Sequence, residues 1–369
     1  MNTQPGTGRQ RGLSIPTLRV LQTWTRRVLV IALYALAFSI LTSLFVPLAV
    51  AAAAFDLVRG QPWTITRALA FFVWYLACEL VGVATSLLIW IVSGVWAGGD
   101  RDRFLRWNYW LQGSWARLLG RGAFRIFGIR LEVHGSGHLS GERPVLVFVR
   151  HASVADTILA ALLISIPYGV RLRYVLKREL LWDPCLDIVG NRLPNVFVVR
   201  DSAQTEREVA AVANLARGLE AHDGVLIYPE GTRFSPSKKA RIADKLREQG
   251  REEAAAEAEA LRHVLRPRSG GPLALLEVAP QADVIFLAHT GFEGSASFDR
   301  FFNGGLIERT VQAELRVVKA GDIPKSDEAR RAWLMANWRQ VDEFIEQHQG
   351  ATGPSPAPRL GKGAERAKS

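Results

Sequence analysis

Two short polar segments carry side chains suited to acid–base chemistry and to anion binding. The first, His151-Ala-Ser-Val-Ala-Asp156, directly follows the apolar run Val145–Val149. An imidazole at the carboxyl end of a strand, just before a helix, lies where α/β folds place reactive groups. The two side chains can meet if His151 lies in the turn entering the helix and Asp156 in its first turn, with Ser153 as N-cap. Asp156 would then orient an imidazolium; a capping box without a chemical role is the alternative.

The second segment is Tyr228-Pro-Glu-Gly-Thr-Arg-Phe-Ser235, at the end of another apolar run. Gly231 allows a tight turn, and Thr232 and Arg233 offer hydrogen-bond donors to an anion. An ordinary structural turn is the alternative. Each segment taken singly is a weak signal, so the elements that would position them matter.

Residues 131–349 alternate short β-branched runs with helical stretches, which predicts an α/β domain with a mainly parallel central sheet. Helices are expected over Thr205–His222 and over Ser326–Gln347, where the second closes the domain. The expected strands are Val145–Val149, Leu172–Leu176, Val196–Arg200, Val225–Tyr228, Val284–Ala288 and Val311–Val318.

Two long apolar segments precede this domain. Val28–Phe55 has no charged side chain, and Ala68–Ala97 has one, Glu79. Each exceeds the roughly 20 residues that a helix needs to cross a bilayer, and the first is too long for a signal peptide. We therefore expect a two-helix transmembrane hairpin over residues 28–97, with buried core helices as the alternative. Whether Glu79 has a function or only contacts the partner helix stays open.

The net charge of +11 would also suit a protein that binds nucleic acid. The basic excess, however, is concentrated beside the apolar segments, in residues 1–27 and 98–130, and in the tail from residue 350. The α/β domain itself is nearly neutral. By the positive-inside rule both flanks of the hairpin face the cytoplasm. The charge therefore indicates a membrane protein with a cytoplasmic domain and no nucleic-acid partner.

Four flanking segments complete the expected organisation. Residues 1–27 are a basic cytoplasmic N-terminus and residues 350–369 a disordered tail. Residues 98–130 mix arginines with aromatic side chains, which predicts an amphipathic helix at the lipid headgroups; a helix packing its aromatics on the domain is the alternative. Residues 238–262 form a charged helical insertion, expected to be solvated unless it contacts a partner or the membrane.

Taken together, the HX4D and EGTR motifs behind two membrane helices resemble the glycerolipid acyltransferase family, in particular its 1-acylglycerol-3-phosphate (lysophosphatidic acid) acyltransferases. Lys177-Arg178-Glu179-Leu180 and Asn195–Arg200 look like further blocks of that family, and other blocks are similar to its longer membrane-bound subgroup. One departure is Arg150, which precedes the motif histidine where Asn is frequent. Because of this departure, the resemblance does not fix which acceptor lipid the protein would use.

The resemblance implies acyl transfer without an acyl-enzyme. As catalytic residues, His151 would take the proton from the free hydroxyl of lysophosphatidate and Asp156 would hold the ring, giving phosphatidate for phospholipid synthesis. The donor would be acyl-CoA or acyl-ACP (acyl carrier protein), bound as a substrate, with no bound cofactor and no metal. The acceptor's phosphate and glycerol would be contacted by Glu230, Gly231, Thr232, Arg233, Arg200 and Lys177.

Three other functions remain open on the sequence. The acceptor could carry another headgroup, as in the remodelling of membrane phospholipids. The same pair could activate water in a lipid or thioester hydrolase, although no G-x-S-x-G nucleophile motif is present. A non-catalytic lipid-binding protein is the third. Rich usage of alanine and arginine, without an organellar signal, predicts a bacterial inner membrane with the catalytic domain on its cytoplasmic face.

Overall fold

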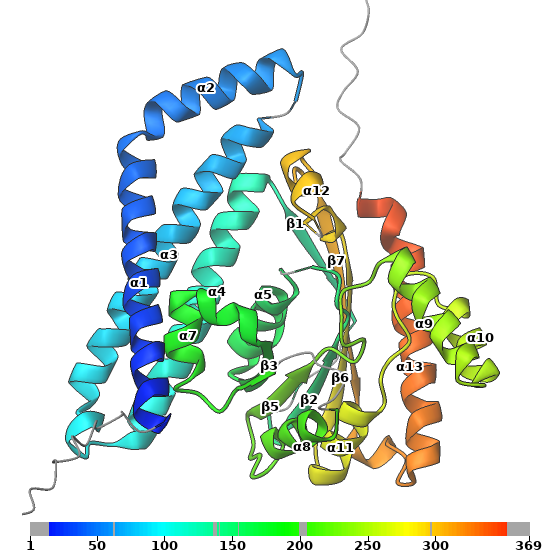
Figure 1. Ribbon diagram of the computed structural model, residues 1–369. Coiled ribbons are helices and arrows are strands. Elements are labelled where there is room, and N and C mark those ends of the chain that lie inside the picture. The colour runs from blue at the N-terminus through cyan, green and yellow to red at the C-terminus, as the bar shows by residue number, and fades with distance from the viewer. Residues whose placement is uncertain are drawn as a thin grey trace, which may run out of the picture.

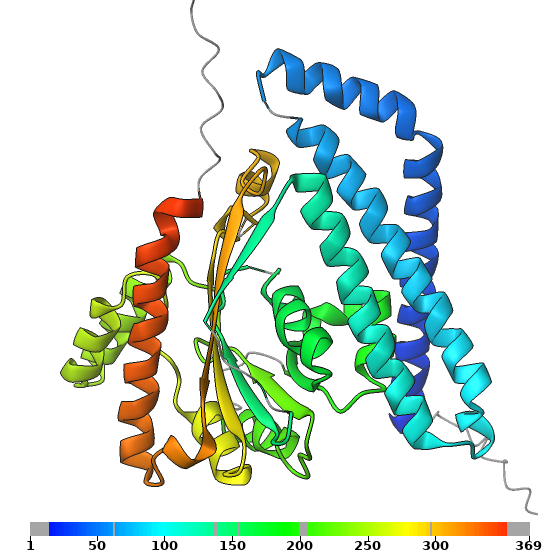
Figure 2. The same ribbon diagram turned by 180° about the vertical axis from the view of Figure 1, so that it is seen from behind.

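The fold is given by a computed structural model that describes residues 15–61, 63–135, 139, 141–153, 155–198, 205–295 and 297–352. A twisted sheet has helices on both faces, and long N-terminal helices lie to one side (Figures 1 and 2). Within the described residues the strand order is β1-β7-β6-β2-β5-β3-β4. The strands are β1 Arg130–His134, β2 Val145–Val149, β3 Arg171–Lys177, β4 Val196–Val198, β5 Asp223–Ile227, β6 Asp283–Thr290 and β7 Thr310–Val318.

The predicted α/β architecture with a mainly parallel sheet is confirmed. Among the described strand pairs only β6 and β7 run antiparallel. The central strands β2, β5 and β6 are buried along their whole length, as expected where helices cover both faces. Strand β1 was not predicted, because its polar residues Arg130, Glu132 and His134 interrupt the apolar pattern.

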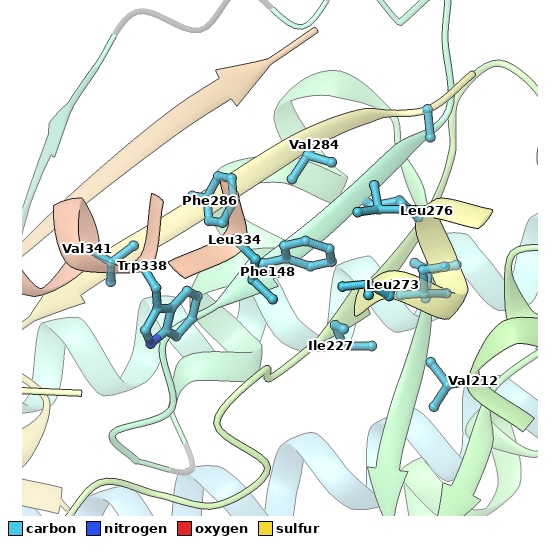
Figure 3. Close-up of a cluster of buried hydrophobic side chains, with 14 of the residues drawn as sticks. Phe148, Val212, Ile227, Leu273, Leu276, Val284, Phe286, Leu334, Trp338 and Val341 are labelled. Carbon is cyan, nitrogen blue, oxygen red and sulfur yellow. The ribbon is translucent and has the colours of Figure 1, made fainter. Parts of the chain in front are cut away.

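One face of the sheet is covered by α8 (Thr205–Leu215), α11 (Gly270–Val278) and α13 (Asp327–His348). Figure 3 shows Phe148 and Phe286 of the sheet against Trp338 of α13, which is fully buried. Helix α8 ends before the predicted His222, because the chain passes into 3₁₀-type turns and then a left-handed Gly218.

The opposite face is covered by short helices. They are α5 (Asp156–Ala160), a π-helical turn (Ala161–Ser165), α6 (Ile166–Tyr168), a 3₁₀ helix (Arg178–Trp182) and α7 (Pro184–Gly190). Leu159 and Ile164 from this group are fully buried against the sheet. These helices also provide the surface on which the N-terminal helices pack.

The N-terminal region contains α1 (Ile15–Ser43), α2 (Phe45–Val58) and α3 (Thr64–Ser93). Residues 20–43 and 64–97 are long and apolar enough to cross a membrane. The predicted single helix over 28–55 is wrong, because the chain bends at Leu44 and α2 turns across the end of the α1–α3 pair (Figure 1). Pro47 accounts for the bend: it has no N–H for the Ser43 carbonyl, and its ring crowds that carbonyl.

Helix α4 (Arg101–Phe127) is amphipathic as expected, but its aromatic side chains mostly face protein. It runs alongside α3 in both views (Figures 1 and 2). Trp107, Tyr109 and Trp115 pack in a cluster with Cys185 of α7, whereas Trp110 remains 62% exposed. The structure therefore favours the alternative in which this helix packs its aromatic side chains on the domain.

Polar contacts hold the N-terminal helices against α7. Arg26 and Arg27, from the predicted basic N-terminus, belong to α1 and pair with buried Asp187 at 2.8 and 3.0 Å. Glu79 of α3 is fully buried and accepts from Trp115 Nε1 at 2.9 Å and from the Cys185 N–H at 3.0 Å. Glu79 thus links the membrane segments to α4 and α7.

The charged insertion forms two helices, α9 (Pro236–Glu248) and α10 (Glu252–Ala260), with Gly250 in the left-handed region between them. Alanines of α10 are buried against Ala243 and Leu246 of α9. The remaining described helices are the 3₁₀ turns Val95–Ala97, Glu293–Ser295, Ala320–Asp322 and Gln349–Thr352, and α12 (Phe298–Phe302). The predicted disordered tail lies beyond these elements, and from residue 353 it is outside the described residues.

Candidate active site

The two polar motifs lie at the same edge of the sheet. His151 follows β2, and Tyr228 follows β5, which pairs with β2 in parallel. Because the carboxyl ends of parallel strands share an edge, the loops after them meet. The Phe234 N–H donates to the His151 carbonyl at 2.9 Å, so the motifs are joined directly through their main chains.

The His151 ring and the Asp156 carboxylate are in contact. His151 Nδ1 lies 3.1 Å from Asp156 Oδ2, with the two side chains 11% and 0% exposed. Helix α5 begins at Asp156, which places the carboxylate in the first turn as expected. The prediction of Ser153 as N-cap is wrong, because Ala155 holds that position. Ser153 Oγ instead donates to Asp156 Oδ1 at 2.9 Å.

Asp156 is ionised despite its burial. Burial alone would raise its pKa, but the electrostatic effect of the neighbouring His289 and the hydrogen bond and charge of His151 lower it below the usual value. The N–H groups of Ala152 and Ser153 add bonds of 2.7 and 2.9 Å to Oδ2. A carboxylate held in this way accepts from His151 Nδ1–H, which leaves Nε2 as the basic nitrogen of the ring.

The His151 ring also packs on Tyr228, with ring centroids 4.4 Å apart. The Tyr228 hydroxyl lies 2.9 Å from Thr157 Oγ1 on α5. The imidazole therefore has the carboxylate on one side and an aromatic ring against its face, and few orientations remain open to it.

Glu230, the first residue of the EGTR motif, is buried behind His151. It is only 1% exposed, and it accepts from the His151 N–H at 2.7 Å and from the Leu265 N–H at 2.8 Å. Burial raises its pKa to about 8, while these two bonds favour the ionised form. With both oxygens bonded to the main chain, Glu230 holds the two motifs together. Its contact with the acceptor stays a prediction.

The other EGTR residues lie at the surface of the same edge. Gly231 has φ +69°, and a side chain there would come within 2.9 Å of Arg268, which explains the glycine. Lys238 Nζ donates to Thr232 Oγ1 at 3.1 Å and to the Arg233 carbonyl at 3.0 Å. Lys238 was predicted only as part of the charged insertion, and its role in holding this loop needed the tertiary structure.

Lys177 and Arg200 are the two remaining residues that were predicted to contact the acceptor's phosphate. Lys177 ends β3, which pairs with β5 in parallel, so it lies on the same edge of the sheet and is half-buried. Arg200 lies outside the described residues.

Two residues that were assigned no role in the site from the sequence lie behind the pair. The Arg150 side chain is 1% exposed and pairs with Glu293 at 2.5 Å, and the same Nη1 donates to the His289 carbonyl at 2.6 Å. His289 is fully buried, with Nε2 3.5 Å from Asp156 Oδ1. The unusual Arg150 was the available signal for this layer, whereas His289 lies within the apolar strand β6 and no spacing marks it.

Among the described residues, no group of three or more His, Cys, Asp or Glu side chains could hold a metal ion. The cavities lie apart from the His151–Asp156 pair. One cavity of about 230 Å³ lies between α4 and the start of β3, lined by Tyr109, Arg117 and Tyr174 among others. Another of about 380 Å³ lies beside Glu293 and Arg309.

Comparison with known proteins points to one family. Residues 130–275 match the family model described as Acyltransferase. The 1-acyl-sn-glycerol-3-phosphate acyltransferase alpha of Mus musculus is 31% identical over 118 residues, which are 32% of this chain and 39% of that protein. The Homo sapiens protein of the same name is 30% identical over 109 residues, or 29% of this chain and 36% of the relative.

The match therefore spans about two fifths of these relatives' length. A crystal structure of the 1-acyl-sn-glycerophosphate (LPA) acyltransferase PlsC from Thermotoga maritima is similar with a TM-score of 0.42 and 17% identity. That similarity covers 73% of this chain and 96% of that one. The family match covers residues 130–275, the part of the chain that contains both motifs.

Proposed function

We propose that this protein transfers a fatty acyl group from an acyl thioester to the free hydroxyl of lysophosphatidate, producing phosphatidate for phospholipid synthesis. One observation carries the proposal: the 3.1 Å contact between His151 and Asp156 at the sheet edge that also holds the EGTR loop. The acyltransferase family match supports the reaction class, and the names of the relatives support the acceptor.

In the proposed mechanism His151 Nε2 takes the proton of the acceptor hydroxyl as that oxygen attacks the thioester carbonyl. Asp156 stabilises the imidazolium that forms. The tetrahedral intermediate then collapses, the ester bond remains, and the thiolate leaves with the proton that His151 returns to it. General-base catalysis of this kind commonly contributes roughly 10²–10⁴-fold to the rate.

The acceptor's phosphate is proposed to bind Arg233, Thr232, Lys177 and Arg200 because guanidinium and ammonium groups pair well with phosphate oxygens. Support comes from the half-buried position of Arg233 and Lys177 at the edge where His151 lies. Gly231 gives this loop its turn, and Glu230 is proposed to hold the loop to the His151 main chain.

We further propose that α1 and α3 embed the protein in a bacterial inner membrane, with the domain on the cytoplasmic face. Support comes from the two apolar helices and from their antiparallel course, which brings the start of α1 and the end of α3 to the same end (Figure 1). The arginines of α4 beside that end fit the positive-inside rule. The donor reaches the site from the cytoplasm as acyl-CoA or on an acyl carrier protein, and the acceptor from membrane lipids.

The direct test is acyl transfer by membranes that contain the protein. We expect labelled acyl-CoA or acyl carrier protein with lysophosphatidate to yield phosphatidate, and His151→Ala to lower the rate by about 10³-fold or more, because the base is lost. An unchanged rate in that variant would show that His151 is not the base. Lysophospholipids with other headgroups separate remodelling from synthesis, and release of free fatty acid instead of lipid product would indicate a hydrolase.

A further inference from the structure

A buried histidine on β6 lies directly behind the His151–Asp156 pair. His289 Nε2 is 3.1 Å from the carbonyl oxygen of Arg150, the residue immediately before His151. The same nitrogen is 3.5 Å from Asp156 Oδ1. One imidazole nitrogen thus reaches both the main chain that carries the base and the carboxylate that orients it.

The surroundings of His289 define which nitrogen carries its hydrogen. A carbonyl oxygen and an ionised carboxylate both accept hydrogen bonds, so Nε2 must be the donor. Burial lowers the pKa of His289, and the Arg150 guanidinium lowers it further, against the opposing charges of Asp156 and Glu293. Nδ1 is buried without a hydrogen-bond partner among the described residues, which fits a neutral ring protonated on Nε2 alone.

Contacts in the opposite direction fix His289 in place. Arg150 Nη1 donates to the His289 carbonyl at 2.6 Å, and Arg150 Nη2 donates to the His263 carbonyl at 3.1 Å. The Arg150 N–H also donates to the Leu287 carbonyl at 3.1 Å, and Glu293 completes the set by pairing with the guanidinium. The ends of β2 and β6 are therefore bonded to each other in both directions, and the His289 ring has a defined position relative to Asp156.

We propose that His289 is a positioning residue, which holds Asp156 and the main chain before His151 in the arrangement that acyl transfer requires. The inference deepens the proposed function and rests on it for the identity of the reaction. The Nε2–H also shares the negative charge of Asp156. Without it, more of that charge acts on His151, whose imidazolium is then stabilised and forms at higher pH.

Two substitutions separate positioning from packing. His289→Leu removes the donor, whereas His289→Gln can place an amide N–H near the position of Nε2. For His289→Leu we expect kcat to fall by about tenfold with KM for both substrates unchanged. The acid limb of kcat/KM should move up by about 0.5 pH unit. His289→Gln should keep most of kcat, and the acid limb of its kcat/KM pH profile should lie where it does in the parent protein.

Two further variants complete the set. His134→Leu, on β1 beside Gln312 and away from the pair, should leave both quantities unchanged. If the Leu variant does not fold, His289→Asn, whose shorter amide cannot reach Asp156, replaces it.

A second measurement does not depend on the acceptor. Ethoxycarbonylation of His151 in the resting full-length protein, followed by peptide mass spectrometry across pH, reports the protonation of its ring. The pH of half-maximal labelling should rise in the Leu or Asn variant and stay in the Gln variant. This shift in a protein that transfers no acyl group would overturn the proposed reaction and support the positioning role. The positioning role would be overturned if all His289 variants lost kcat and Tm equally while the acid limb of kcat/KM and the pH of half-maximal labelling stayed unchanged.

Discussion

Asp156 and Glu230 are buried carboxyl groups at the same sheet edge, yet their surroundings shift their pKa values in opposite directions. Asp156 has two imidazoles beside it, which outweigh burial and lower its pKa. Glu230 has only main-chain N–H groups and a more distant guanidinium, so burial dominates and raises its pKa. The difference suits their positions: Asp156 faces the His151 ring, which gains a charge in the proposed acyl transfer, and Glu230 joins two loops.

Arg150 and Glu293 form the ion pair that closes this layer, and it makes stability depend on pH. Burial would raise the pKa of Glu293, but Arg150 lowers it to about 2. A carboxyl with a lowered folded-state pKa contributes stability above its unfolded-state pKa, and this stability is lost as the pH falls toward 2. We expect Glu293→Gln to reduce the free energy of unfolding at pH 7 by about 2 kcal/mol.

The difference between Glu293→Gln and the parent protein should shrink as the pH falls from about 4.3 to about 2. Chemical denaturation at a series of pH values measures it. Glu259→Gln removes the exposed ion pair with Arg247 and is the matched control. Its free energy of unfolding should differ little from that of the parent protein. A difference that stays constant down to pH 2 would contradict the role given to the ion pair.

At the scale of elements, the sheet edge brings the two motifs together, and helix α9 makes hydrogen bonds to the EGTR loop. Helix α9 starts at Pro236, three residues after Arg233, with the Ser235 side chain accepting from the Lys238 N–H. This capping directs Lys238 back toward the EGTR loop, where it binds Thr232 and the Arg233 carbonyl. The charged insertion thus has a defined contact with the site at its first turn.

Helix α9 therefore yields a prediction about acceptor binding. Lys238→Met should loosen the EGTR loop and raise KM for lysophosphatidate by about tenfold, with a smaller effect on kcat, because a loss of about 1.4 kcal/mol in binding corresponds to that factor. Steady-state kinetics with a fixed, saturating donor measures it. Lys245→Met, exposed on the same helix, serves as the control. Equal KM values in the two variants would show that the contact of Lys238 with the EGTR loop does not contribute to acceptor binding.

At the scale of the whole molecule, the N-terminal helices pack on the domain along one side. The α1 and α3 helices keep large apolar side chains exposed, among them Leu29, Leu36 and Leu88, each more than half exposed. Their other sides contact α4 and α7 through Glu79 and Asp187. An apolar surface of this extent, on helices long enough to cross a bilayer, supports the membrane-embedded position proposed for α1 and α3.

The exposed apolar helices predict how the protein is extracted from membranes. High salt and alkaline carbonate should leave the protein in the membrane pellet, and detergent should release it, because apolar burial is not screened by ions. Immunoblots of the fractions measure this. Release by salt alone would show that only the arginines of α4 hold the protein to lipid, and would contradict an embedded α1–α3 pair.

Sequence alone determined the α/β class, the central strands and the two residues proposed to act in catalysis. Buried parallel strands such as Val145–Val149 need continuous apolar runs, and membrane helices need long ones, so both leave a periodic signal that can be read locally. His151 and Asp156 were found because both lie in one short motif. The parallel sheet then implied that this motif and the EGTR loop share an edge.

Tertiary structure alone decided what surrounds those residues. Polar β1 lacks the apolar pattern on which strand prediction depended, and the apolar run that continues through Pro47 concealed the bend at Leu44. The ties of Glu230 to His151 and Leu265, of Lys238 to Arg233, and of His289 to Asp156 join atoms whose separation in the chain carries no local pattern. Such contacts arise only when β2, β5 and β6 lie side by side, because hydrogen bonds and pKa shifts depend on distances of a few ångströms that the sheet alone sets.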